Sequence, residues 1–200
     1  TQTNKIKVGY KFGLEFFYSK DGRKFLSNLK NQIIFLDLKL NDIPNTIKSA
    51  IRSLKNLKIS YLTVHLSSGF SALKALKKES RNIKIAGVTT LTSLNNKDLK
   101  EIGYNKKVGE LVRYQAKLAT KAKLDAIVCS GHEIRSVKKV FGKEIITPGI
   151  KMQNEKNDQK RIMGPADAFD AGSDWLVIGR SITSGNIKKN FKNLLKVLED

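Results

Sequence analysis

The sequence is poor in several residue types, with one cysteine, three prolines, one tryptophan and two histidines among 200 residues. A single cysteine excludes an intrachain disulfide, and nothing else suggests an oxidising compartment, so we expect a cytoplasmic protein. No stretch approaches the roughly 18 consecutive apolar residues that a membrane span needs. The opening segment, Thr1 to Lys7, is polar and basic and lacks the apolar core of a signal peptide. We therefore expect a soluble protein with no membrane partner.

Acidic residues are also scarce: 18 Asp and Glu stand against 38 Lys and Arg, a formal net charge of +20. Such an excess raises the possibility of a nucleic-acid partner. However, the lysines recur at helical spacings and are not interleaved with aromatic residues, which favours a solvated outer face and no nucleic-acid partner. Representative groups are Lys74, Lys77 and Lys78; Lys117, Lys121 and Lys123; and Lys188, Lys189, Lys192 and Lys196.

Short apolar runs rich in β-branched residues recur along the chain and predict buried strands. A chain of this length with 40% hydrophobic residues can bury one core, so we expect a single domain over residues 1–200. The seven predicted strands are Ile6 to Tyr10, Ile33 to Leu40, Tyr61 to Leu66, Ile83 to Leu91, Ala126 to Ser130, Glu144 to Ile150 and Asp174 to Ser181.

Amphipathic segments alternate with these runs and predict helices, so the fold class is α/β with a parallel sheet covered by helices. A (β/α)8 barrel and an open doubly wound sheet both fit this alternation. Seven strands are one fewer than a closed barrel requires, and an eighth would have to precede Thr1. The predicted helices are Thr46 to Leu57, Phe70 to Glu79, Val108 to Lys123, His132 to Phe141, Pro165 to Ala171 and Ile187 to Leu198.

Two charged residues, Asp37 and Lys39, interrupt the second apolar run near its carboxyl end. Because a strand has a period of two, both side chains should point to the same side and lie close together. Charges in an apolar strand are costly to desolvate unless they pair or bind a ligand. A buried structural ion pair is one explanation. The carboxyl end of a strand is where barrel enzymes place catalytic residues, which favours an active site.

The segment Phe35-Leu-Asp-Leu-Lys-Leu-Asn-Asp-Ile-Pro-Asn-Thr46 resembles the signature of the bacterial-type orotidine 5′-phosphate decarboxylase family. Further segments resemble the family's blocks in the same order, and together they imply a TIM barrel whose first strand is absent from this sequence. These segments are Lys7-Val-Gly9, Val64-His-Leu-Ser-Ser-Gly69, Val88-Thr-Thr-Leu-Thr-Ser93, Thr147-Pro-Gly-Ile150, Asp158-Gln-Lys-Arg-Ile-Met163 and Val177-Ile-Gly-Arg180.

The resemblance implies cofactor-independent conversion of orotidine 5′-phosphate to uridine 5′-phosphate and carbon dioxide, the last step of de novo UMP biosynthesis. It implies that Lys39 is the proton donor, that Asp37 orients it, and that Lys7 joins the same charged network. Family members are homodimers with shared active sites, and by that resemblance Asp42 would reach into the partner's site. The family's first strand carries a ribose-binding aspartate, which has no counterpart in this sequence.

The substrate-binding residues implied by the resemblance extend beyond these charges. Barrels frequently bind phosphate with the loops that follow strands seven and eight, and an arginine there offers a planar fork to phosphate oxygens. Lys151 is a further candidate at a position where the family often has arginine; it keeps the charge but loses the fork. The implied residues are Ile43, Thr46, Thr92, Gln159, Gly179 and Arg180.

Two other functions compete with this interpretation. One is a magnesium-dependent keto-sugar-phosphate decarboxylase of the same suprafamily, which shares the Asp-x-Lys-x-x-Asp pattern but not the continuation from Ile43 to Thr46. The other is a basic nucleic-acid-binding module on a decayed barrel, suggested by the charge and the absent strand. A zinc site is not expected, because His65 and His132 have no neighbours at metal-ligand spacing.

Overall fold

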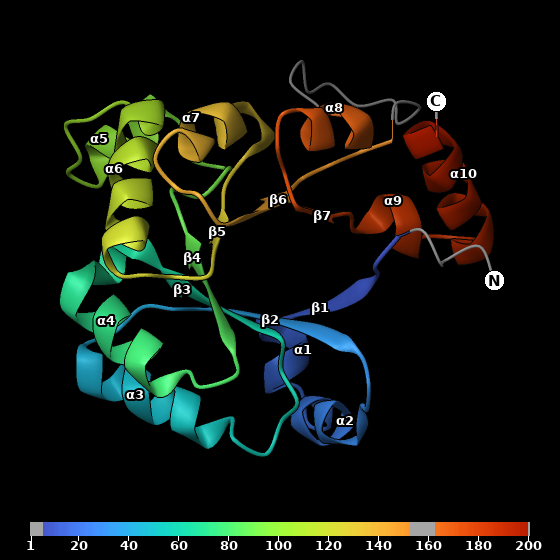
Figure 1. The fold of residues 1–200 in the computed structure, drawn as a ribbon. Coiled ribbons are helices and arrows are strands. Elements are labelled where there is room, and N and C mark those ends of the chain that lie inside the picture. Colours follow the sequence, from blue (N-terminus) through green and yellow to red (C-terminus); the bar gives the residue numbers. More distant parts are fainter. Residues whose placement is uncertain (1–5, 153–162, 200) are drawn as a thin grey trace. The chain divides into compact units, whose positions relative to one another are not determined.

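The computed structural model describes residues 6–152 and 163–199 (Figure 1). The chain forms two compact units: unit 1 comprises Thr1–Val88 and Leu118–Asp125, and unit 2 comprises Thr89–Lys117 and Ala126–Asp200. This grouping does not test the single domain expected from the sequence, which stays a prediction. Within the described residues, no helix is long and apolar enough to cross a membrane.

Unit 1 contains a parallel sheet of four strands in the order β1-β2-β3-β4. Its strands are β1 (Gly9–Gly13), β2 (Ile33–Leu40), β3 (Tyr61–His65) and β4 (Lys84–Val88), and its helices are α1 (Leu14–Tyr18), α2 (Gly22–Asn28), α3 (Pro44–Ser53), the 3-10 turn η2 (Leu66–Ser68) and α4 (Gly69–Glu79). Helices α3 and α4 pack together. Leu36, Leu62 and Leu73 are fully buried, so the apolar centres of the strands and α4 form the core of this unit.

Unit 2 contains three further parallel strands, in the order β5-β6-β7. Its strands are β5 (Ala126–Val128), β6 (Glu144–Pro148) and β7 (Trp175–Val177). Its helices are α5 (Asn96–Glu101), the part of α6 (Val108–Lys121) up to Lys117, the 3-10 turn η3 (Gly131–Glu133), α7 (Ile134–Lys138), α8 (Pro165–Asp170), α9 (Arg180–Thr183) and α10 (Ile187–Glu199). Ile127, Ile134 and Ile145 are fully buried at its centre.

The described residues thus contain the seven strands and the strand–helix alternation that the sequence predicts. The first strand was placed wrongly: it was expected over Ile6 to Tyr10 but spans Gly9–Gly13. Gly9 fits beside Ile33 because it has no side chain; a Cβ there would lie 3.0 Å from Ile33 Cγ2. The short helices α1, α2, α5 and α9 were not predicted, since each is too short to show a clear helical period.

A recurring contact fastens the amino ends of the strands. The residue just before a strand donates its backbone amide to the carbonyl of a residue in the preceding strand. In return, its side-chain oxygen accepts a hydrogen bond from the backbone amide of that residue in the preceding strand. We call this two-way contact a strand-start bridge. It occurs between Ser60 and Ile34 (2.9 and 3.1 Å) and between Asp125 and Ile85 (3.0 and 2.9 Å) in unit 1, and between Asp174 and Ile145 (2.8 and 2.8 Å) in unit 2.

Candidate active site

The carboxyl half of β2 departs from a regular strand. Leu36 pairs with Leu62 of β3, and Leu40 pairs with Val64, so Asp37, Leu38 and Lys39 lie opposite the single residue Thr63. This bulge puts Lys39 in the left-handed region with a φ of 48°. That conformation costs a residue with a Cβ roughly 1–2 kcal/mol, so the surrounding contacts must hold it.

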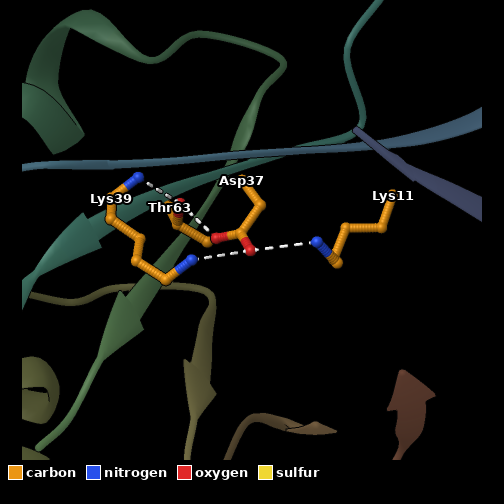
Figure 2. A network of polar contacts seen from close by, with 4 residues as sticks. All are labelled: Lys11, Asp37, Lys39 and Thr63. Atoms are coloured by element: carbon orange, nitrogen blue, oxygen red, sulfur yellow. Dashed lines mark hydrogen bonds and ion pairs between the residues drawn. The ribbon is translucent and has the colours of Figure 1, made fainter. Parts of the chain in front are cut away.

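The bulge brings Asp37 and Lys39 together, as the sequence predicts. Lys39 Nζ lies 2.8 Å from Asp37 Oδ2, and Lys11 Nζ of β1 approaches the same oxygen at 3.3 Å. The other carboxylate oxygen, Oδ1, accepts a hydrogen bond of 3.0 Å from Thr63 Oγ1 (Figure 2). We call these four residues the Asp37 cluster. Because it holds two ammonium groups and one carboxylate, it has a net positive charge and suits an anionic ligand.

Asp37 is only 9% exposed, yet its surroundings favour the ionised form. Burial alone would raise the pKa of its carboxyl group. The hydrogen bond and charge of Lys39, the charge of Lys11 and the hydrogen bond from Thr63 outweigh burial and lower that pKa below its ordinary value. Asp37 therefore stays a carboxylate at neutral pH and accepts a hydrogen bond from Lys39 Nζ.

Lys11 and Thr63 are the members of this cluster that sequence reasoning missed. Lys7 was expected to join Asp37, but it is exposed and lies before β1, whereas Lys11 lies within the strand and makes the ion pair. The chain has two Lys-x-Gly triplets in succession, ending at Gly9 and at Gly13. The triplet alone therefore could not show which lysine reaches Asp37. The strand register could, because it pairs Asp37 with Gly13, the last residue of the triplet that begins at Lys11.

His65 stands close to the cluster on β3, two residues beyond Thr63 and half-buried. Burial lowers the pKa of its imidazole, and the positive charge of Lys39 lowers it further, while Asp37 opposes the shift. No motif in the sequence predicts that His65 lies near Lys39. An alternation of side chains along the apolar run of β3 is the signal that could have done so.

Asp42, Ile43 and Thr46 lie where β2 passes into α3, and all three are exposed. Asp42 Oδ1 accepts the amide of Ile43 at 2.7 Å, and Ile43 is 66% exposed. The helix begins at Pro44 and not at Thr46 as expected, because proline suits the first helical turn. The segment thus presents an acidic, an apolar and a hydroxyl side chain to the outside of unit 1.

The remaining candidates belong to unit 2. Thr92 is exposed in a turn, and Lys151 is half-buried after β6. Gly179 is the N-cap of α9 and Arg180 is its first residue, and both are exposed. Gln159 lies outside the residues that the structure describes. Their role in binding a substrate stays a prediction.

A sequence model described as "Orotidine 5′-phosphate decarboxylase / HUMPS family" matches residues 3–190 of this chain. Two curated relatives named orotidine 5′-phosphate decarboxylase support the match. The protein of Wolbachia pipientis subsp. Culex pipiens is 43% identical, with 97% of this chain and 89% of the relative covered. The protein of Carboxydothermus hydrogenoformans is 38% identical, with coverages of 90% and 80%.

Solved structures support the barrel class. The crystal structure of orotidine 5′-phosphate decarboxylase from Lactobacillus acidophilus has a TM-score of 0.81 and 30% identity, covering 100% of this chain and 94% of that one. The corresponding structure from Pyrococcus horikoshii has a TM-score of 0.75 at 23% identity, with coverages of 95% and 86%, and so bears on the fold alone. Of the two folds left open by the sequence, the (β/α)8 barrel class is confirmed.

Proposed function

The chain belongs to the orotidine 5′-phosphate decarboxylase / HUMPS family, and we propose that it carries out its chemistry at the Asp37 cluster. The reaction is the decarboxylation of orotidine 5′-phosphate to uridine 5′-phosphate and carbon dioxide, the last step of UMP biosynthesis. The observation that carries the proposal is the contact of Lys39 Nζ with the buried carboxylate of Asp37 at 2.8 Å, with Lys11 on the same oxygen. The nucleic-acid-binding alternative is not favoured.

Loss of carbon dioxide from the pyrimidine ring leaves an electron pair on the ring carbon. In this proposal the Lys39 ammonium stabilises that developing carbanion and then donates the proton that replaces the carboxylate. Asp37 holds the ammonium in place and destabilises the substrate carboxylate by like-charge repulsion, while Lys11 keeps Asp37 ionised. The chemistry requires no cofactor, since each of these steps uses a side chain of the protein.

The charge pair alone cannot supply the whole rate enhancement. Two unit charges about 4 Å apart interact by roughly 4 kcal/mol at an effective dielectric constant of about 20. The largest enzymatic accelerations need on the order of 20 kcal/mol. We therefore assign part of the transition-state stabilisation to binding energy from the phosphate, through Arg180, Gly179 and Gln159, with Lys151 as a further cation and Thr92 as a contact of the pyrimidine.

We also propose a homodimer in which Asp42, Ile43 and Thr46 of one subunit contribute to the site of the other. Their exposure supports this assignment, because a buried Asp42 could not serve a neighbouring molecule. A cytoplasmic location belongs to the same proposal: the only cysteine is buried and free, as suits a reducing compartment.

Release of carbon dioxide from carboxyl-labelled orotidine 5′-phosphate tests the proposal directly. The purified chain should release label and form uridine 5′-phosphate, both with and without a metal chelator. Abolition by the chelator would instead support the magnesium-dependent relative. Failure to release label while DNA or RNA binds with steep salt dependence would support the nucleic-acid module.

A further inference from the structure

Thr63 occupies a special place in the Asp37 cluster. It is fully buried, and it is the single β3 residue opposite the three-residue bulge of β2. Its Oγ1 accepts the amide of Lys39 at 2.7 Å and donates to Asp37 Oδ1 at 3.0 Å (Figure 2). One hydroxyl group therefore contacts the backbone of one charged residue and the side chain of the other.

The amide of Lys39 needs such an acceptor. In a regular strand it would bond to a carbonyl of the neighbouring strand, but the bulge breaks the ladder at this position. A buried amide without a partner is unfavourable, and Lys39 is already in the left-handed region. Without the Thr63 hydroxyl, the backbone at Lys39 would lower its free energy by relaxing toward an extended conformation. That change would turn the Lys39 side chain away from Asp37.

We propose that Thr63 is a positioning residue for decarboxylation, whose hydroxyl holds the Lys39 backbone and the Asp37 carboxylate in the one arrangement that aims the Lys39 ammonium at the reacting carbon. The proposal rests on the function assigned above to Asp37 and Lys39 and extends it to a residue that acts through both of them. The hydroxyl is required as donor and acceptor at once, so serine should replace threonine and valine should not.

Ser60 offers a matched comparison on the same two strands. Its Oγ also accepts a β2 amide, that of Ile34, at 3.1 Å, but at the opposite end of the strand pair and without contact to Asp37 or Lys39 in the described structure. Loss of the Ser60 hydroxyl should weaken the sheet in a similar way. Only loss of the Thr63 hydroxyl should disturb the chemistry.

The test compares kcat, KM and melting temperature for Thr63→Val, Thr63→Ser and Ser60→Ala. Misplacement of a reacting group by about 1 Å lowers rates by roughly 100-fold, and we expect a kcat loss of that order for Thr63→Val, with KM close to that of the wild type. Thr63→Ser should recover most of kcat. Ser60→Ala should melt at a lower temperature and keep its kcat. Thr63→Ala is the second hydroxyl-free variant, in case valine prevents folding.

The pH profile supplies a readout that a merely structural threonine would not move. Removing the hydrogen bond from Thr63 to Asp37 removes one of the contacts that favour the carboxylate, so the acid limb of the kcat profile should shift to higher pH in Thr63→Val and not in Ser60→Ala. An unshifted limb, wild-type kcat in Thr63→Val, or no recovery with serine would each overturn the proposal.

The same assays separate this proposal from the function on which it rests. If the wild type releases no carbon dioxide, the assigned reaction is wrong. If the wild type is active and Lys39→Ala is not, the reaction stands. Retention of full kcat by Thr63→Val would then contradict the positioning role alone.

Discussion

Lys11 of β1 and Asp37 of β2 form an ion pair between neighbouring parallel strands, with Lys11 Nζ 3.3 Å from Asp37 Oδ2. The register pairs Lys11 with Phe35, so Asp37 lies two residues further along β2 on the same side of the sheet. Together with the Lys39 contact at 2.8 Å, this places two cations on one carboxylate oxygen. Lys11 thus supports the charge of Asp37 from a different strand.

Replacing Lys11 should therefore harm the reaction, and replacing Lys7 should not. Removing one electrostatic stabiliser from an active site typically lowers kcat by roughly 100-fold or more, and we expect Lys11→Ala to fall in that range. Lys7→Ala is the matched control, since it removes a lysine from the neighbouring Lys-x-Gly triplet. Initial rates of decarboxylation measure both. A larger loss for Lys7→Ala than for Lys11→Ala would contradict the assignment.

Lys39 can be replaced in two ways that separate its chemistry from its backbone strain. Both Lys39→Ala and Lys39→Gly should lose kcat by about 10²- to 10⁴-fold, the range typical of a lost proton donor. Glycine accepts the φ of 48° without a Cβ clash. The free energy of unfolding of Lys39→Gly should therefore be about 1 kcal/mol higher than that of Lys39→Ala. Urea unfolding measures this difference.

The same pair of substitutions at Lys48, inside α3, supplies the control for that ranking. Glycine in a helix interior is about 1 kcal/mol less favourable than alanine, so Lys48→Gly should be the less stable of the two. If the glycine variant is less stable than the alanine variant at both positions, the left-handed conformation does not strain Lys39.

The proximity of Asp37 and Lys39 could be predicted from the sequence, although the prediction assumed the period of a regular strand. The bulge that produces it could not, since the run from Ile33 to Leu40 contains no glycine or proline to mark an irregularity. The bulge lies opposite Thr63 on the next strand and is held by a long-range contact that no local pattern encodes.

Thr63 itself was unpredictable for a related reason. A threonine in an apolar strand has a common structural role, and its importance follows only from what lies opposite it. The same holds for Lys11, which the register of β1 on β2 distinguishes from Lys7. The alternation of strands and helices was predictable in contrast, because each strand carries its own apolar run.

His65 predicts a dependence of stability on pH. Its folded-state pKa lies below the ordinary 6.5, so between those two values the unfolded chain binds more protons than the folded one. The free energy of unfolding should therefore fall as the pH drops below 6.5 toward the lowered value. His65→Gln should weaken this fall, and His132→Gln, at an exposed position, serves as the control. Equal curves for the wild type and His65→Gln would contradict the prediction.

The proposed homodimer with shared sites predicts complementation between two inactive proteins. Lys39→Ala and Asp42→Ala damage different contributions to the site, so a hybrid dimer should contain one site with neither change. Mixing the two proteins under conditions of subunit exchange should restore part of the activity, measured as labelled carbon dioxide. Mixtures that exchange subunits and stay inactive would argue that Asp42 serves its own subunit.

The strand-start bridge of Asp125 predicts a loss of stability without a loss of chemistry. Asp125→Ala leaves the buried amide of Ile85 and the ammonium of Lys77 without this carboxylate, which should lower the free energy of unfolding by about 1–3 kcal/mol. The exposed Asp170→Ala should change it by less than about 0.5 kcal/mol. Denaturant unfolding measures both, and a kcat of Asp125→Ala well below that of the wild type would contradict the prediction.

The strand-start bridges all stand at the amino ends of strands, whereas Asp37 and Lys39 stand toward the carboxyl end of theirs. The residues of these bridges are therefore different from those that we propose to act on a substrate. Sequence drift in the segments after the strands should alter substrate preference before it impairs folding. Laboratory evolution of a new specificity should begin in those segments and leave Ser60, Asp125 and Asp174 unchanged.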